Sequence, residues 1–168
     1  MDQKLKMGGV FHFECRDAAG WLKWTATAKN LVTTAGLQHA LDALFAGGTQ
    51  VDPWYVGLTD GTPTVDASDT VASHAGWAEV TAYDEATRQE YVDVRANQTV
   101  SNAASKAVFT VSTNSTTIGG AFLASDNTRG GSTGTLLCAA AFTGGDKSAD
   151  DGDTLSVTYE FTAADDGV

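Results

Sequence analysis

Apolar and polar side chains alternate along the first part of the chain with the period of β-strands. The alternation covers residues 9–16 and again residues 21–28, so that one face of each run is mainly apolar. A turn-like segment, Asp-Ala-Ala-Gly at 17–20, separates the two runs. We therefore expect an antiparallel hairpin over residues 9–28, with one buried face on each strand.

A helical period replaces the alternation between residues 33 and 46. Apolar side chains recur there at intervals of three and four residues, at Leu37, Ala40, Leu41, Leu44 and Phe45. This spacing predicts one amphipathic helix of about three turns. A threonine at 33 or 34 can cap its start, and the glycine at 47 can end it.

Short extended segments follow the helix, with turn-forming residues between them. We expect strands at 54–58, 77–82, 90–95, 106–112, 117–124, 135–142 and 154–162, which with the hairpin makes about nine strands. Closely spaced strands and a single helix predict a mainly β fold, an antiparallel β-sandwich or barrel. No alternation of strands and helices is present, which excludes doubly wound nucleotide-binding folds.

The chain length predicts one domain. At 168 residues the chain can bury one substantial core, whereas two domains would each be short of core. We expect a single domain over 1–168, in which a hairpin (9–28) and a helix (33–46) precede the β-sandwich (54–162).

Acidic side chains outnumber basic ones, 21 to 10, so that the net charge is −11. This charge repels phosphate backbones and anionic lipid surfaces, so we expect neither nucleic acid nor a membrane as a partner. No run approaches the roughly 18 apolar residues of a membrane span. The first ten residues lack the apolar run of a secretion signal, so we expect the protein to stay in the cell that makes it.

Histidines are the first candidates for catalytic chemistry, and none has a partner at metal-ligand spacing. His12 lies on the polar face of the first strand, and His39 lies on the helix. Only His74, next to Ser73 and near Asp69, has the residue types of a hydrolytic triad. Neighbours along one loop rarely point at one another, and no known catalytic motif is present. We expect no enzyme activity, no catalytic residue, no cofactor and no metal.

Two further features leave alternatives open. The cysteines, Cys15 and Cys138, lie in apolar stretches; they are either buried free thiols, a disulfide or a reactive thiol. The acidic loop at 146–153 carries Asp146, Asp150, Asp151 and Asp153. It is either solvated or a cation site, although it lacks the order of an EF-hand loop.

Tryptophans are the best candidates for protein contacts. Four of them in a small sheet protein exceed what one core usually needs, and Trp21 is out of phase with Trp24. One of these two indoles must therefore face away from the core, against a loop or against another protein. The candidate interface residues are Trp21, Trp54 and Trp77.

A resemblance to a known family comes from the order of several segments. Residues 30–37 read Asn-Leu-Val-Thr-Thr-Ala-Gly-Leu, residues 54–61 read Trp-Tyr-Val-Gly-Leu-Thr-Asp-Gly, and residues 69–77 read Asp-Thr-Val-Ala-Ser-His-Ala-Gly-Trp. Segments at 101–109, 120–126 and 152–159 follow in the same order. Together, over about 30–162, they resemble small virion structural proteins of tailed bacteriophages.

The resemblance implies a head decoration (cement) protein. Such a protein is a jelly-roll-like sandwich, often a homotrimer, which sits on the capsid exterior and bridges major capsid subunits after synthesis in the host cytoplasm. The hairpin at 9–28 lies outside the strongest resemblance. The alternatives are a tail, tail-fibre or baseplate component that shares the fold, and a carbohydrate-binding β-sandwich whose exposed aromatic rings stack on sugars.

Overall fold

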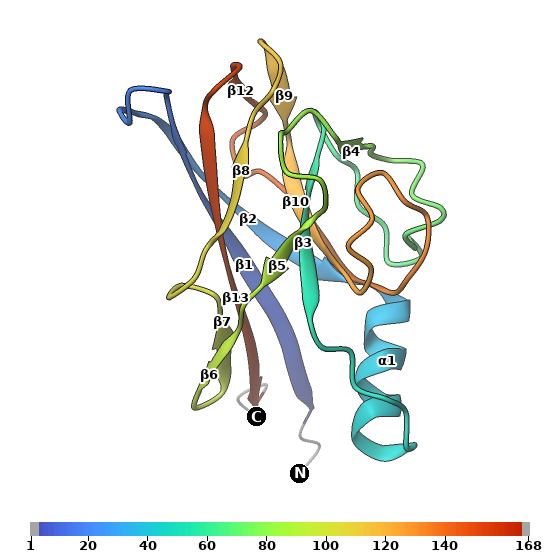
Figure 1. Cartoon of the computed structure of the whole chain (residues 1–168). Coiled ribbons are helices and arrows are strands. Elements are labelled where there is room, and N and C mark those ends of the chain that lie inside the picture. The colour runs from blue at the N-terminus through green and yellow to red at the C-terminus, as the bar shows by residue number, and fades with distance from the viewer. Residues whose placement is uncertain (1–3, 166–168) are drawn as a thin grey trace.

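The computed structural model describes residues 4–165, which contain thirteen strands and one helix (Figure 1). The elements are β1 (Leu5–Arg16), β2 (Leu22–Val32), α1 (Thr34–Phe45), β3 (Trp54–Thr59), β4 (Glu79–Val80), β5 (Gln89–Tyr91), β6 (Val94–Ala96), β7 (Thr99–Ser101), β8 (Ala107–Thr110), β9 (Thr116–Ile118), β10 (Gly120–Ala124), β11 (Leu136–Ala141), β12 (Lys147–Ala149) and β13 (Thr154–Asp165). The mainly β, antiparallel fold with one helix is as predicted.

Eleven strands form one antiparallel sheet in the order β4-β3-β10-β11-β2-β1-β13-β7-β6, with β5 paired to β3 and β8 paired to β13. The strands β9 and β12 form a small separate pair. The long strand β2 belongs to both halves of the large sheet, because residues 22–29 pair with β1 and residues 30–32 pair with β11. The sheet bends at β2, so its two halves face each other as in a sandwich. The jelly-roll form of that sandwich stays a prediction.

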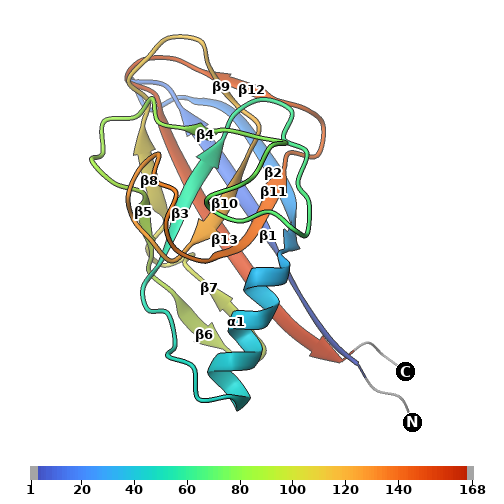
Figure 2. The ribbon, with the colours of Figure 1, turned by 90° about the vertical axis from the view of Figure 1, so that its right-hand side faces the viewer.

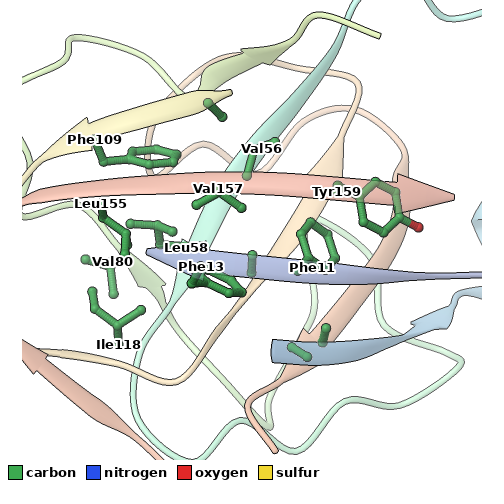
Figure 3. Packing of buried hydrophobic residues seen from close by; sticks show 14 of the residues in the cluster. Phe11, Phe13, Val56, Leu58, Val80, Phe109, Ile118, Leu155, Val157 and Tyr159 are labelled. Carbon is green, nitrogen blue, oxygen red and sulfur yellow. The ribbon is translucent and has the colours of Figure 1, made fainter. Parts of the chain in front are cut away.

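One apolar core fills the space between the two halves (Figure 3). The strand β1 contributes Phe11, Phe13 and Cys15, the alternate positions that the sequence pattern places on one face. The ring of Phe11 stacks on that of Tyr159 from β13, with centroids 4.1 Å apart. The opposite half contributes Val56 and other residues of β3, β10 and β11. Burial of these side chains is the main term that stabilises the fold.

The N-terminal hairpin is part of this sandwich rather than an addition to it. β1 pairs with β2 on one side and, along its whole length, with β13 on the other. Both of its strands are also longer than the predicted 9–16 and 21–28. A sandwich limited to 54–162 would therefore lack the two central strands of the sheet.

Several predicted strands are divided or shorter in the structure. The run at 90–95 forms β5 and β6, and the run at 117–124 forms β9 and β10, while only 79–80 of the run at 77–82 is a strand. The strands β7 and β12 were not predicted. Strands of three residues contain too few alternations to show a period, which explains these differences.

The helix begins at the predicted position and packs against β11. It does so through Gly36 and not through its leucines. The Thr33 side chain caps it by accepting a hydrogen bond from the Gly36 amide at 3.0 Å. Beyond its last turn, Gly47 adopts a left-handed φ of 73°.

Within residues 4–165, no helix has the length and apolar character needed to cross a membrane.

Candidate interaction surfaces

The leucine ridge, which we define as Leu37, Leu41, Leu44 and Phe45, is the largest departure from the expected packing. The apolar side of such a helix normally covers the core. Here the exposed fraction of these side chains rises from 45% at Leu37 to 82% at Phe45. The ridge is therefore an apolar surface that nothing in the described part of the chain covers.

Close contact through a glycine explains why the ridge faces outward. A Cβ atom on Gly36 would lie 2.3 Å from the Leu137 carbonyl oxygen, so the helix approaches β11 closer than any side chain would allow. The half-buried Ala40 and Ala43 lie on the same side of the helix as Gly36. This small-residue face packs on the sheet, and the ridge beside it remains in solvent.

The ridge is also nearly uncharged. Among the residues of α1, Asp42 is the only one with a formal charge at neutral pH when His39 is neutral. A chain with net charge −11 therefore presents one surface that another protein can approach without strong repulsion. Apolar surfaces of this kind mark contact sites on soluble proteins.

A second exposed apolar site lies at the far end of the sheet, at the turn between β1 and β2. Trp21 is 76% exposed there, beside the exposed Leu22. Asp17 holds the turn, because its carboxylate accepts hydrogen bonds from the amides of Ala19 at 2.9 Å and Trp21 at 2.8 Å. Figure 1 shows this turn and α1 at opposite ends of the molecule, and Figure 2 shows the same separation from the side.

The candidate tryptophans occupy three different environments. Of the two indoles that are out of phase, Trp21 is the exposed one, while Trp24 packs against the core. Trp54 is half-buried beside His39. Trp77 is buried, and its indole Nε1 donates to the Asp69 carboxylate at 3.0 Å. Among the three interface candidates, Trp21 offers the most surface to a partner and Trp77 offers almost none.

The residues of the candidate triad hold a loop together instead of meeting as a triad. The His74 ring stacks on Trp77 with centroids 3.8 Å apart, and its Nδ1 lies 2.9 Å from the Trp77 carbonyl oxygen. Asp69 accepts its hydrogen bonds from Trp77 and from the Asp66 amide. No hydrogen bond joins Ser73, His74 and Asp69 to one another in the described residues. The other two histidines also lie apart, with His12 on the outer face of β1.

A lysine pairs with two of the four carboxylates of the acidic loop. The Lys23 Nζ lies 2.9 Å from the Asp150 carboxylate and 2.5 Å from the Asp153 carboxylate. The hydrogen bond from Lys23 lowers the pKa of Asp150 below its usual value. The Asp146 carboxylate instead accepts hydrogen bonds from the amide and the hydroxyl of Thr62. In the part of the chain from 4 to 165, no group of three or more metal-ligating side chains could hold an ion.

Both cysteines are free and buried. Burial raises the pKa of the Cys15 thiol and that of the Cys138 thiol to about 11 each. A thiol with such a pKa is almost entirely protonated at neutral pH, and the thiolate is the nucleophilic form. The structure therefore favours the alternative in which the two cysteines act as small apolar side chains.

The outer face of β1, β2 and β13 forms a shallow polar groove. It is lined mainly by hydroxyl groups, by His12 and Glu14, and by Lys106. The aromatic ring at this groove is that of Phe13, which is buried. This face therefore lacks the exposed aromatic ring on which a sugar would stack.

Sequence reasoning missed the exposure of the leucine ridge. The helix pattern shows which positions are apolar, and it does not show which of them meet the sheet. The small residues at 36, 40 and 43 were the available signal, because small side chains permit close packing.

No family model matches the chain, and no curated protein or solved structure matches it.

Proposed function

We propose that this chain is a structural protein of a tailed-bacteriophage particle, which decorates the capsid and stabilises it by bridging neighbouring major capsid subunits. One observation carries the proposal: exposed apolar side chains lie at two opposite ends of a stiff β-sheet. These are the leucine ridge at one end and Trp21 with Leu22 at the other. A molecule with two such ends can contact two partners at once.

The sheet has the length and stiffness that bridging requires. β1 and β13 have 12 residues each and pair along their whole length, which corresponds to a span of roughly 40 Å at about 3.4 Å per residue. β2 pairs on the other side of β1, so the long strands support each other. Many copies that each make two modest contacts can add considerable stability to a shell.

The charge of the chain suits the outside of a particle. Because a net charge of −11 opposes contact with packaged nucleic acid, the protein favours the capsid exterior. A contact role of this kind needs no cofactor and no turnover of a substrate. The proposal includes assembly as a homo-oligomer, with a trimer as the form that the sequence resemblance implies.

Addition of the purified protein to capsids that lack it tests the proposal. We expect binding at a fixed stoichiometry and a higher temperature of capsid opening. The variant Leu41→Asn/Leu44→Asn should bind at least tenfold more weakly and still fold cooperatively, because both side chains are exposed in the free protein and the lower helix propensity of asparagine costs about 1 kcal/mol in total. The matched control is Val108→Asn, which removes an exposed apolar side chain from β8.

The location on the particle separates this function from its alternative. Antibody labelling confined to the tail would show a tail, tail-fibre or baseplate component instead of a decoration protein. Purified protein that binds neither capsids nor tails would contradict a structural role in the particle.

A further inference from the structure

A cleft opens beside α1, at the same end of the molecule as the leucine ridge. It has a volume of about 290 Å³ and lies between the helix, the segment that follows the helix, and the ends of the two sheet halves. Pockets for drug-sized molecules usually hold about 300–1,000 Å³. The cleft is therefore sized for one side chain or a comparably small group.

Aromatic rings line the cleft. The half-buried Trp54 and Phe161 lie at its sides, while the buried Tyr91 and Tyr159 lie deeper. The Tyr91 hydroxyl donates to the Val100 carbonyl oxygen at 2.9 Å, so this polar group is already satisfied. The partly exposed rings of Trp54 and Phe161 present apolar and π-electron surface to whatever enters, while the buried tyrosine rings support them from below.

Two carboxylates at the cleft give it a negative charge. Asp52 precedes β3 and Asp93 follows β5, and the side chains of both are exposed. Neither carboxylate has a hydrogen bond or an ion pair within residues 4–165. The cleft contains no lysine or arginine among its lining residues. Burial, and to a lesser extent the charge of Asp93, raises the pKa of Tyr91, which agrees with a negative potential here.

Aromatic walls combined with unpaired carboxylates favour an organic cation. Aromatic faces attract cations through their quadrupole. A guanidinium group is planar and weakly hydrated, so it stacks on rings and donates to carboxylates at the same time, whereas an ammonium group is compact and strongly hydrated. The cleft therefore suits arginine better than lysine.

We infer that this cleft binds the arginine side chain of a partner protein that docks on the helix end of the molecule. That the partner is a capsid protein rests on the proposed function. That the cleft accepts an arginine side chain rests only on the residues that line it. The leucine ridge would supply apolar contact area next to the cleft, while the arginine would fix the orientation of the partner.

Titration of the isolated protein with N-acetyl-arginine-methylamide tests the inference. In two-dimensional NMR spectra, we expect shifts of the backbone amide resonances of Asp52, Trp54 and Asp93 and of the indole resonance of Trp54. The matched probe is N-acetyl-citrulline-methylamide, which has nearly the same shape and no charge. It should bind at least tenfold more weakly.

Variants separate a specific site from general attraction to an acidic protein. Asp52→Asn/Asp93→Asn should weaken binding of the arginine probe at least tenfold. Asp84→Asn/Asp151→Asn removes the same charge from exposed positions outside the cleft and should weaken it less than twofold. Equal losses in both variants, equal binding of the citrulline probe, or shifts that spread over the whole surface would overturn the inference.

The result is distinguishable from a failure of the proposed function. If the protein binds the arginine probe but does not bind capsids, the arginine site is supported and only the capsid is excluded as the partner. Binding to capsids that persists in the Asp52→Asn/Asp93→Asn variant, without any response to the arginine probe, would remove the cleft and leave capsid decoration.

Discussion

Arg88 shows how much one buried side chain can decide. Its guanidinium donates to the Glu79 carboxylate through two nitrogens, at 2.9 and 2.7 Å, and both side chains are almost fully buried. The same group donates to the carbonyl oxygens of Asp126 and Gly131. Arg88 therefore anchors the loop that connects β10 and β11 to the strand β4.

Arg88→Leu should destabilise the fold strongly. The substitution leaves the Glu79 carboxylate buried without its partner, and the loss of one member of a buried ion pair costs about 3–5 kcal/mol. Urea denaturation measures the change. Arg95→Leu is the control, because Arg95 is exposed and its side chain donates only to the Asn97 carbonyl oxygen; its cost should stay within about 0.5 kcal/mol.

The same loop should respond to acid through Asp126. Hydrogen bonds from Thr128, and then from Thr133, lower the pKa of this carboxyl to about 2. Because the pKa of this carboxyl is lower in the folded protein, its ionised form stabilises the fold at pH values above its unfolded pKa of about 3.9. This contribution is lost as the pH falls toward 2. The Thr128 amide resonance should titrate with a midpoint near 2. A midpoint near 4 would contradict these contacts, and Asp126→Asn should abolish the transition.

At the scale of elements, the helix illustrates the limit of pattern reading. The apolar positions of α1 cover a wide arc that includes both the small residues and the leucine ridge, so the period alone cannot select the buried side. The selection depends on Leu137, whose carbonyl oxygen lies where only a glycine can approach. Gly36 thus determines which side chains reach solvent.

Gly36→Ala tests that account of the helix. Helix propensity alone favours alanine by about 1 kcal/mol. The added methyl group would clash with the backbone of Leu137, and overpacking of this kind costs about 1–3 kcal/mol. We expect a net loss of stability in urea denaturation, because the clash involves backbone that cannot move away easily. The exposed Gln38→Ala is the control, and a Gly36→Ala protein more stable than the unmodified chain would contradict the packing.

At the scale of the whole molecule, the first and the last strand of the described chain lie side by side in the sheet. β1 and β13 pair over twelve residues, and their side chains Phe11, Leu155 and Tyr159 lie in the core. This part of the sheet and of the core therefore depends on contacts between the beginning and the end of the described chain.

Removal of residues 1–28 should unfold the protein rather than leave an intact smaller sandwich. The shortened chain lacks β1 and most of β2, so β13 loses a partner along its whole length and the core loses four buried side chains, those of Phe11, Phe13, Cys15 and Ala28. Circular dichroism and amide resonance dispersion measure the outcome. In the full-length chain, Phe11→Ala should cost about 3–5 kcal/mol. A shortened chain with a cooperative unfolding transition would contradict this view of the hairpin.

Local patterns in the sequence were sufficient for the elements that persist over many residues. The alternation at Phe11, Phe13 and Cys15 and the helical period after Thr33 each repeat several times, so the hairpin, the helix and the antiparallel class could be predicted. The charge of −11 likewise follows from composition alone. These properties depend on neighbours along the chain.

Only the tertiary structure decided which apolar groups are exposed and which charges meet. The exposure of the leucine ridge depends on a carbonyl oxygen of β11, and the arginine-sized cleft joins residues from seven strands and the helix. The partners Arg88 and Glu79 lie in different elements, and β1 finds β13 across almost the whole chain. Such contacts depend on the path of the backbone in space, which the period and the composition of a sequence do not contain.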